Sequence, residues 1–187
     1  MTTAVFLDRD GVINRKAPEG EYVTRWEDFH VLPGVVEGIA QLNRKGLLVV
    51  VVTNQRCVAK GLMTEAELKK LHRQMTEHFA ESGAKIDGIY YCPHDVEPPC
   101  DCRKPAPGML LAAAKWHGVN LAASWMIGDS ESDIQAGKSA GCRTVRLLAN
   151  PRRERNSSST LECEGKADLV ATSLPKAIQQ ILQTSHL

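Results

Sequence analysis

Two carboxylates, Asp8 and Asp10, stand two residues apart directly after the apolar run 4–7. Successive residues of a strand point to opposite faces, so the chain must turn at Gly11 to bring both side chains together. In open α/β sheets, ligands bind beyond the carboxyl ends of the strands. The position and spacing of the pair therefore suit a metal-assisted site in which one carboxylate is a nucleophile.

Three further motifs follow predicted strands or precede a predicted helix. They are Thr53-Asn54-Gln55, Arg103-Lys104-Pro105 and Gly128-Asp129-x-x-x-Asp133. Strands that end at one sheet edge would bring all four motifs together. The set then offers a carboxylate nucleophile, a second carboxyl for proton transfer, a hydroxyl donor, a fixed cation and a further carboxylate for a metal. Phosphoryl transfer needs this combination, and Mg²⁺ prefers oxygen ligands of this kind.

A second group of residues has the composition of a structural zinc site. Its members are Cys92, His94, Cys100 and Cys102, in a loop over residues 92–102. Three thiolates and one imidazole form a closed tetrahedral ligand set, which leaves no position for catalysis. The alternative is a group of reduced cysteines, which two Cys-x-(Cys or His) pairs only five residues apart make a poor explanation. Zinc would fix the loop that leads directly into Arg103 and Lys104.

Short β-branched runs alternate with helical patterns along the chain, which predicts an α/β fold: a Rossmann-like parallel sheet with helices on both faces. We expect one domain over residues 1–187, a flap over about 12–32 and an exposed loop over 150–166. The strands are predicted at 4–7, 47–52, 86–91, 125–127, 144–148 and 168–171, and the helices at 33–45, 65–79, 107–116, 131–140 and 174–182. The segments between the motifs are too short for a large cap domain.

Two of these helices have defined starts and core faces. Pro33 is expected at the first position of its helix, with Val36 turned toward the core. Thr64 and Glu67 form the pattern of a capping box. The apolar face of the helix that follows is predicted to contain Leu68, Leu71, Met75, His78 and Phe79.

Composition narrows the possible partners and the compartment. The net charge is +1, with 43% hydrophobic and 24% charged residues, which gives no electrostatic footprint for nucleic acid or membrane. No apolar run approaches the roughly 20 residues of a membrane span, and residues 1–10 lack the features of a signal peptide. We therefore expect a cytoplasmic protein, a monomer, whose cysteines are thiols or metal ligands.

The four motifs, in this order across residues 5–133, resemble the haloacid dehalogenase superfamily of phosphatases. The resemblance implies that Asp8 forms an aspartyl-phosphate, and that Asp10 protonates the leaving oxygen and then activates water. It also implies that Thr53 and Lys104 hold the phosphoryl oxygens.

The same resemblance implies a magnesium site. Mg²⁺ would be bound by Asp8, the backbone carbonyl of Asp10 and Asp129, with Asp133 acting from behind these ligands. Each motif by itself is weak, since Asp-x-Asp-Gly is more often a turn, Thr53 is compatible with a helix cap and Lys104 with a surface charge. Their order along the chain outweighs those interpretations.

Together with the cysteine motifs, the chain is similar to the D-glycero-D-manno-heptose 1,7-bisphosphate 7-phosphatase family and to the related histidinol-phosphate phosphatases. The residues that carry the similarity are 8–14, Thr53-Asn54-Gln55, Cys92-Pro93-His94, residues 100–105 and Gly128-Asp129-Ser130. By that similarity the substrate is a small phosphorylated sugar, and Arg103 contributes to its recognition. The residues implied at the substrate mouth are Gly20, Tyr22, Asn54, Gln55 and Arg56.

One departure from the family pattern concerns the substrate. Arg56-Cys57 stands where the heptose enzymes usually carry Ser-Gly. A guanidinium at this position could bind a second phosphate bidentately, or it could mark a different substrate.

Three rival functions stay open: a histidinol-phosphate phosphatase, a non-catalytic zinc-stabilised module that binds a phosphorylated ligand, and a zinc-knuckle nucleic-acid binder, which the near-neutral charge disfavours.

Overall fold

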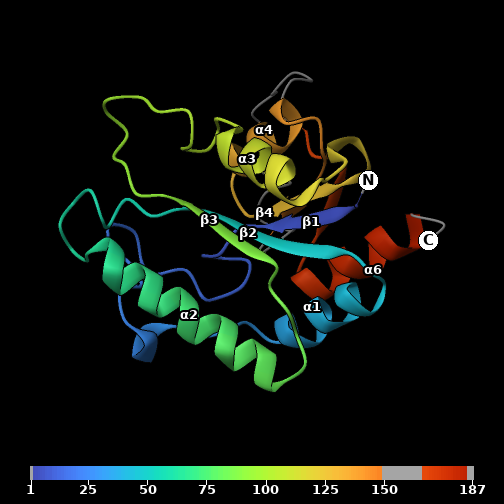
Figure 1. Cartoon of the computed structure of the whole chain (residues 1–187), viewed down its shortest axis with the longest axis horizontal. Coiled ribbons are helices and arrows are strands. Elements are labelled where there is room, and N and C mark those ends of the chain that lie inside the picture. The colour runs from blue at the N-terminus through green and yellow to red at the C-terminus, as the bar shows by residue number, and fades with distance from the viewer. Residues whose placement is uncertain (1, 149–165, 185–187) are drawn as a thin grey trace.

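A parallel sheet of six strands runs through the middle of the molecule in the computed structural model (Figure 1). The structure describes residues 2–148 and 166–184, so residues 150–165 of the predicted loop lie outside it. The strand order is β3-β2-β1-β4-β5-β6. The strands are β1 (Ala4–Leu7), β2 (Leu48–Asn54), β3 (Gly88–Cys92), β4 (Trp125–Gly128), β5 (Arg143–Leu147) and β6 (Leu169–Ala171).

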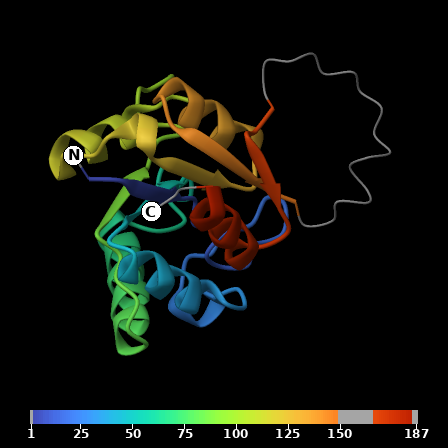
Figure 2. The same cartoon turned by 90° about the vertical axis from the view of Figure 1, so that its right-hand side faces the viewer.

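Helices cover both faces of the sheet, and the two views in Figures 1 and 2 agree on their placement. One face is covered by α1 (Val35–Arg44), α2 (Glu65–Glu81) and α6 (Leu174–Thr184). The other face is covered by α3 (Gly108–His117) and α4 (Glu131–Ser139). The predicted fold class, a Rossmann-like parallel sheet between helices, is confirmed.

Strand β1 contributes to both cores because its side chains alternate. Val5 and Leu7 belong to the core beneath α1, α2 and α6. Ala4 and Phe6 belong to the core beneath α3 and α4. All four residues are fully buried, so the strand that precedes Asp8 is held rigidly from both sides.

The strand order reverses between β1 and β4, which are paired in register from Val5 with Trp125 to Leu7 with Ile127. In doubly wound sheets the ligand crevice lies at this reversal, outside the carboxyl ends of the strands. Asp8 follows β1, and its backbone N–H donates to the carbonyl of Ile127 at 3.0 Å. Asp129 follows β4, so the fold places two of the motif carboxylates on either side of the crevice.

Two predicted element boundaries were wrong for identifiable reasons. Strand β2 continues through Thr53 and Asn54, because these residues pair with Tyr91 and Cys92 of β3. Helix α1 begins at Val35 rather than Pro33, because Gly34 takes a left-handed conformation with φ of 73°. As a result Val35 is fully buried and Val36 only half-buried.

Helix α2 begins with the predicted capping box, in which Thr64 and Glu67 bond each other's backbone N–H. Its core face differs from the prediction at one residue. His78 is exposed, and His72 is buried in its place. His72 lies on the face of α2 that covers Arg9.

The flap over residues 12–32 is closed at its base by an antiparallel bridge between Asn14 and Val31. Beyond a 3₁₀ turn at Trp26–Asp28, it contains no regular element. Within residues 2–148 and 166–184 there is no cap domain, and no helix there is long and apolar enough to cross a membrane. A single domain, a monomeric state and a cytoplasmic location stay predictions.

Candidate active site

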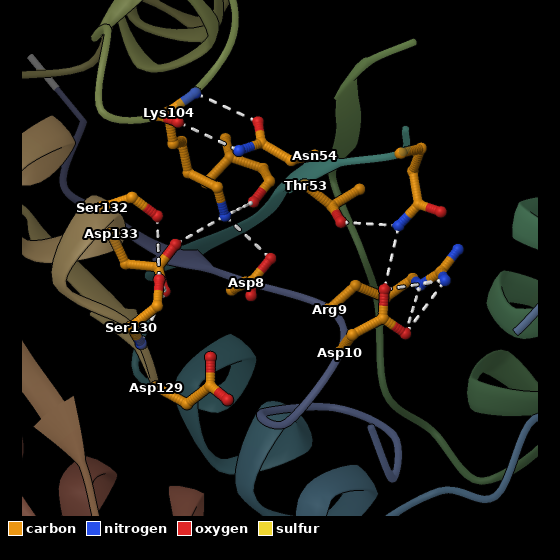
Figure 3. A network of polar contacts seen from close by, with 12 residues as sticks. Asp8, Arg9, Asp10, Thr53, Asn54, Lys104, Asp129, Ser130, Ser132 and Asp133 are labelled. Carbon is orange, nitrogen blue, oxygen red and sulfur yellow. Dashed lines mark hydrogen bonds and ion pairs between the residues drawn. The ribbon is translucent and has the colours of Figure 1, made fainter. Parts of the chain in front are cut away.

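A buried lysine joins two carboxylates at the centre of the site (Figure 3). Nζ of Lys104 lies 2.8 Å from Oδ1 of Asp8 and 2.6 Å from Oδ1 of Asp133, and it also donates to the carbonyl of Val52 at 2.8 Å. Lys104 is only 4% exposed and Asp133 is fully buried. An ammonium without room to move is fixed directly beside the Asp8 carboxylate.

The buried environment changes the ionisation of both partners. Burial raises the pKa of Asp8 to about 7, against the lowering effect of the Lys104 charge, and the charge of Asp133 raises it further. Burial lowers the pKa of Lys104, but the charges of Asp8 and Asp133 outweigh it and raise that pKa above its ordinary value. Lys104 is therefore a permanent cation, and added positive charge near Asp8 would favour its nucleophilic, ionised form.

The Asp10 carboxylate is turned toward Arg9 and away from Asp8 (Figure 3). Nη2 of Arg9 donates to both of its oxygens at 2.9 Å. Nδ2 of Asn14 donates to Oδ1 at 2.9 Å, and Nε2 of Gln55 donates to Oδ2 at 3.0 Å. Burial raises the pKa of Asp10, but Arg9 and these hydrogen bonds outweigh it and hold the pKa below its ordinary value. Asp10 is thus an ionised base in this conformation.

The end of β2 supplies a hydroxyl and two amides to the site. Thr53 is buried, and its Oγ1 accepts a hydrogen bond from Nε2 of Gln55 at 2.8 Å. The side chain of Asn54 bonds the backbone of Lys104 twice, donating to its carbonyl at 3.1 Å and accepting from its N–H at 3.0 Å. Asn54 and Gln55 therefore position Lys104, Thr53 and Asp10.

Three carboxylates form a cluster that fits a hard divalent cation. Asp8, Asp129 and Asp133 each offer an oxygen, and these oxygens lie within 4.8 Å of one another. Oδ1 of Asp129 is buried without a hydrogen-bond partner in the described residues, and a side chain at Gly11 would overlap the same carboxylate. An all-oxygen set with an unpaired buried oxygen suits Mg²⁺. Lys16 of the flap donates to Oδ2 of Asp129 at 3.0 Å.

Asp133 is held by contacts with Ser130 and Lys104. Its Oδ2 accepts from the backbone N–H of Ser130 at 3.0 Å and from the Ser130 hydroxyl at 2.6 Å, while its Oδ1 meets Lys104. Both oxygens thus have partners that hold the start of α4 and the lysine. The expected role of Asp133 behind the metal ligands stays a prediction.

The cysteine loop brings its four predicted ligands together: Cys92, His94, Cys100 and Cys102, whose donor atoms lie within 4.8 Å of one another. Sγ of Cys100 lies 3.6 Å from that of Cys92 and 3.5 Å from that of Cys102. Nδ1 of His94 lies 3.2 Å from Sγ of Cys102. Tetrahedral zinc with bonds of about 2.3 Å places its sulfurs roughly 3.7 Å apart, so the cluster fits the ion.

Comparison with known proteins places these motifs in a family. A HAD-hydrolase-like family model matches residues 101–177. The D-glycero-beta-D-manno-heptose-1,7-bisphosphate 7-phosphatase of Escherichia coli (strain K12) is 39% identical over 187 residues, covering 95% of this chain and 94% of that protein. A protein of the same name from Vibrio cholerae serotype O1 is 45% identical over 152 residues, covering 78% of this chain and 80% of that protein. The chain belongs to this heptose-bisphosphate phosphatase family.

A solved member of the heptose-bisphosphate phosphatase family has the same fold over nearly its whole length. The structure of D,D-heptose 1,7-bisphosphate phosphatase from B. bronchiseptica, complexed with magnesium and phosphate, superposes with a TM-score of 0.85. It is 34% identical and covers 99% of this chain and 100% of that chain. The enzyme from Burkholderia thailandensis gives a TM-score of 0.69 at 30% identity, with 97% of this chain and 99% of that chain covered.

A cavity of about 390 Å³ lies over these motifs. Its lining includes Gly20, Tyr22, Asn54, Gln55 and Arg103, five of the six residues that were expected at the substrate mouth or in sugar-phosphate recognition.

Arg56, the sixth of these residues, does not line the cavity. Its guanidinium instead pairs with Asp95 of the cysteine loop. The idea that Arg56 binds a second phosphate therefore has no support from this arrangement.

The sequence analysis missed two residues of the candidate site, Arg9 and His72. Arg9 is 1% exposed, and its Nη1 lies 3.3 Å from Nε2 of His72. Burial and the Arg9 charge lower the pKa of His72 to about 3, so the imidazole is neutral. Strand alternation contained a usable signal, because Arg9 follows Leu7 by two residues and so continues the face of Val5 and Leu7, which α2 covers.

Proposed function

We propose that this chain is a Mg²⁺-dependent phosphatase that removes the 7-phosphate of D-glycero-D-manno-heptose 1,7-bisphosphate. The observation that carries the proposal is the buried pair of Asp8 and Lys104, beside a cluster of carboxylates that fits Mg²⁺. The names of the relatives support it, as does the solved B. bronchiseptica enzyme, which is complexed with magnesium and phosphate. A binding module would have no need of a fixed cation beside a buried carboxylate nucleophile.

The reaction would proceed in two displacements. A carboxylate oxygen of Asp8 attacks phosphorus, the bond from phosphorus to the sugar oxygen breaks, and Asp10 delivers a proton to that oxygen. Asp10 then takes a proton from a water molecule, which attacks the aspartyl-phosphate and releases phosphate and Asp8. Thr53 and Lys104 bind the equatorial phosphoryl oxygens, where charge develops.

Asp10 must change its contacts between these two roles. In the structure it is held as an ionised base by Arg9, Asn14 and Gln55. To protonate the leaving oxygen it has to acquire a proton and rotate toward the phosphoryl group, away from Arg9. The role of base in the second step requires only the rotation, because the carboxylate is already ionised.

Two metal ions complete the proposal. Asp8, the backbone carbonyl of Asp10 and Asp129 would hold Mg²⁺, with Asp133 supporting the site through Lys104 and Ser130. Bound there, Mg²⁺ would offset negative charge on Asp8 and on the phosphoryl group. Zn²⁺ would be held by the four ligands of residues 92–102 and would fix the loop before Arg103 and Lys104.

Phosphate release with Mg²⁺ tests the substrate assignment. The two anomers of heptose 1,7-bisphosphate, a heptose carrying only the 7-phosphate, and histidinol phosphate are compared at equal concentrations. We expect the highest kcat/KM for the bisphosphate, with the β anomer preferred, and ³¹P NMR should show loss of the 7-phosphate. A tenfold or greater preference for histidinol phosphate would overturn the heptose assignment, and no turnover of any substrate would overturn the enzymatic one.

A further inference from the structure

Lys16, in the flap, makes an ion pair with a proposed magnesium ligand, and the mechanism above gives it no role. Its Nζ lies 3.0 Å from Oδ2 of Asp129. The Lys16 side chain is 60% exposed, whereas that of Asp129 is 20% exposed. The ammonium therefore reaches the carboxylate cluster from the solvent side, on a flexible stem that can move without disturbing the core.

The charges around the cluster indicate that the ion pair between Lys16 and Asp129 depends on whether a metal is bound. Asp8, Asp129 and Asp133 carry three formal negative charges, and Lys104 and Lys16 are the two cations paired with them among the described residues. Lys104 is locked between Asp8 and Asp133, so it cannot leave. Lys16 shares Asp129 with the incoming divalent ion, and a metal bound to this carboxylate cancels most of the charge that attracts the ammonium.

We propose that Lys16 is a tethered cation that Mg²⁺ displaces from Asp129, and that the released ammonium then binds a phosphate oxygen of the substrate. The proposal rests on the proposed function for the identity of the metal and of the anion. It makes metal and phosphate binding interdependent through one side chain. Without phosphate Lys16 opposes the metal, and with the metal present it favours phosphate.

The position of Lys16 supports the second half of this proposal. It lines the same cavity as Asp8, Thr53 and Lys104, at the start of the flap segment 16–23 that borders it. When Mg²⁺ has joined the cluster, the two lysines and the ion carry four positive charges against three negative ones. A phosphate dianion that reaches the cluster is then attracted, and Lys16 is the cation of the cluster that is free to move toward it.

Arg15 provides a matched control, because it is the adjacent flap residue, exposed and also cationic. It lies outside the lining of the catalytic cavity and forms no ion pair with a carboxylate of the cluster in the described residues. Lys16→Met and Arg15→Met remove the same charge from neighbouring positions. A general effect of flap charge would therefore change both variants alike.

Isothermal titration calorimetry on the full zinc-loaded chain tests the proposal with MgCl₂ and with inorganic phosphate as the probes. In phosphate-free buffer we expect Lys16→Met to lower the Kd for Mg²⁺ by about threefold to fivefold. At saturating Mg²⁺ we expect the same variant to raise the Kd for inorganic phosphate by a similar factor. Lys16→Arg should keep the phosphate affinity within twofold of the wild type.

The proposal is overturned if Lys16→Met leaves either affinity within 1.5-fold of the wild type, if it weakens Mg²⁺ binding, or if Arg15→Met causes shifts of equal size. It is also overturned if the wild type binds no Mg²⁺. Because these readouts are binding constants, they separate this inference from the proposed function. If the chain hydrolyses no heptose phosphate but Lys16→Met shifts the Kd for Mg²⁺ and the Kd for phosphate as expected, only the proposed function is refuted.

Discussion

The side-chain amide of Gln55 holds the carboxylate of Asp10, with 3.0 Å between Nε2 and Oδ2. The same nitrogen donates to Oγ1 of Thr53 at 2.8 Å. One buried amide thus joins the proposed proton-transfer carboxylate to the hydroxyl proposed to bind the phosphoryl group. Gln55 was expected at the substrate mouth, and the structure gives it this positioning role as well as a place in the cavity lining.

Substitutions at Gln55 should reduce turnover more than substrate binding. We expect Gln55→Leu to lower kcat by about 10- to 100-fold, since small errors in position are costly for catalysis. Gln55→Glu should be more damaging, because it places a second negative charge beside Asp10. Steady-state kinetics on the same substrate measure both. Wild-type kcat in either variant would contradict the positioning role.

Asp8→Asn should abolish phosphate release, because an amide cannot form the aspartyl-phosphate. The substitution preserves size, and Lys104 keeps Asp133 as a partner at 2.6 Å, so the fold should persist. Zinc content and the thermal unfolding midpoint serve as controls. Retention of more than about 10% of wild-type activity would argue against covalent catalysis by Asp8.

Loss of one proposed zinc ligand should lower activity through the loop that carries Lys104. We expect Cys102→Ala to lose its zinc and to lower kcat by about 10- to 100-fold, with some activity kept because Asn54 still holds the Lys104 backbone. Cys142→Ala removes a buried cysteine outside the cluster and should retain zinc. Elemental analysis and kinetics together decide the question. Full activity in zinc-free Cys102→Ala would show that the metal does not support the site.

His72 should make the folded state sensitive to acid. Its pKa is lowered from 6.5 to about 3 in the folded protein, so below about pH 6.5 the unfolded chain binds a proton that the folded chain does not. Stability is then lost as pH falls from 6.5 toward 3, by at most about 1.4 kcal/mol per pH unit from this one group. Urea unfolding of the wild type and of His72→Gln between pH 4 and 7 measures how steeply the free energy of unfolding of each changes with pH. Identical slopes would show that His72 takes up its proton without cost.

Local patterns predicted the elements well where neighbours in sequence decide them. The capping box at Thr64 depends on Glu67 three residues later, and both its bonds are present. The end of β2 depends on pairing with Tyr91 and Cys92, nearly forty residues away, and β-branched content cannot report that contact. The predicted start of α1 was wrong. Pro33 is a typical first residue of a helix, but the φ of 73° at Gly34 excludes Gly34 from the helix, which therefore begins at Val35.

The sequence predicted which motif residues of the candidate site lie close together. The carboxylates, the lysine and the four proposed zinc ligands come together as the motifs indicated. The sequence did not predict which hydrogen-bond or ion-pair partner each polar side chain would have. Nothing in the helical spacing of α2 distinguishes His72 from His78, and only the packing over Arg9 makes His72 the buried one. The pairing of Arg56 with Asp95 depends likewise on how the cysteine loop folds back.

The central position of β1 determines when Asp8, the proposed nucleophile, can be in place during synthesis. Asp8 leaves the ribosome before β2 and β4 do, yet β1 needs β2 on one side and β4 on the other. Pairings between distant segments form slowly and late, because the intervening chain must first be closed into a loop. A nascent chain that ends before Trp125 leaves one edge of β1 open and lacks Asp129. Strand β1 is therefore completed only after β4 has been made, and the proposed catalytic residues come together late in folding.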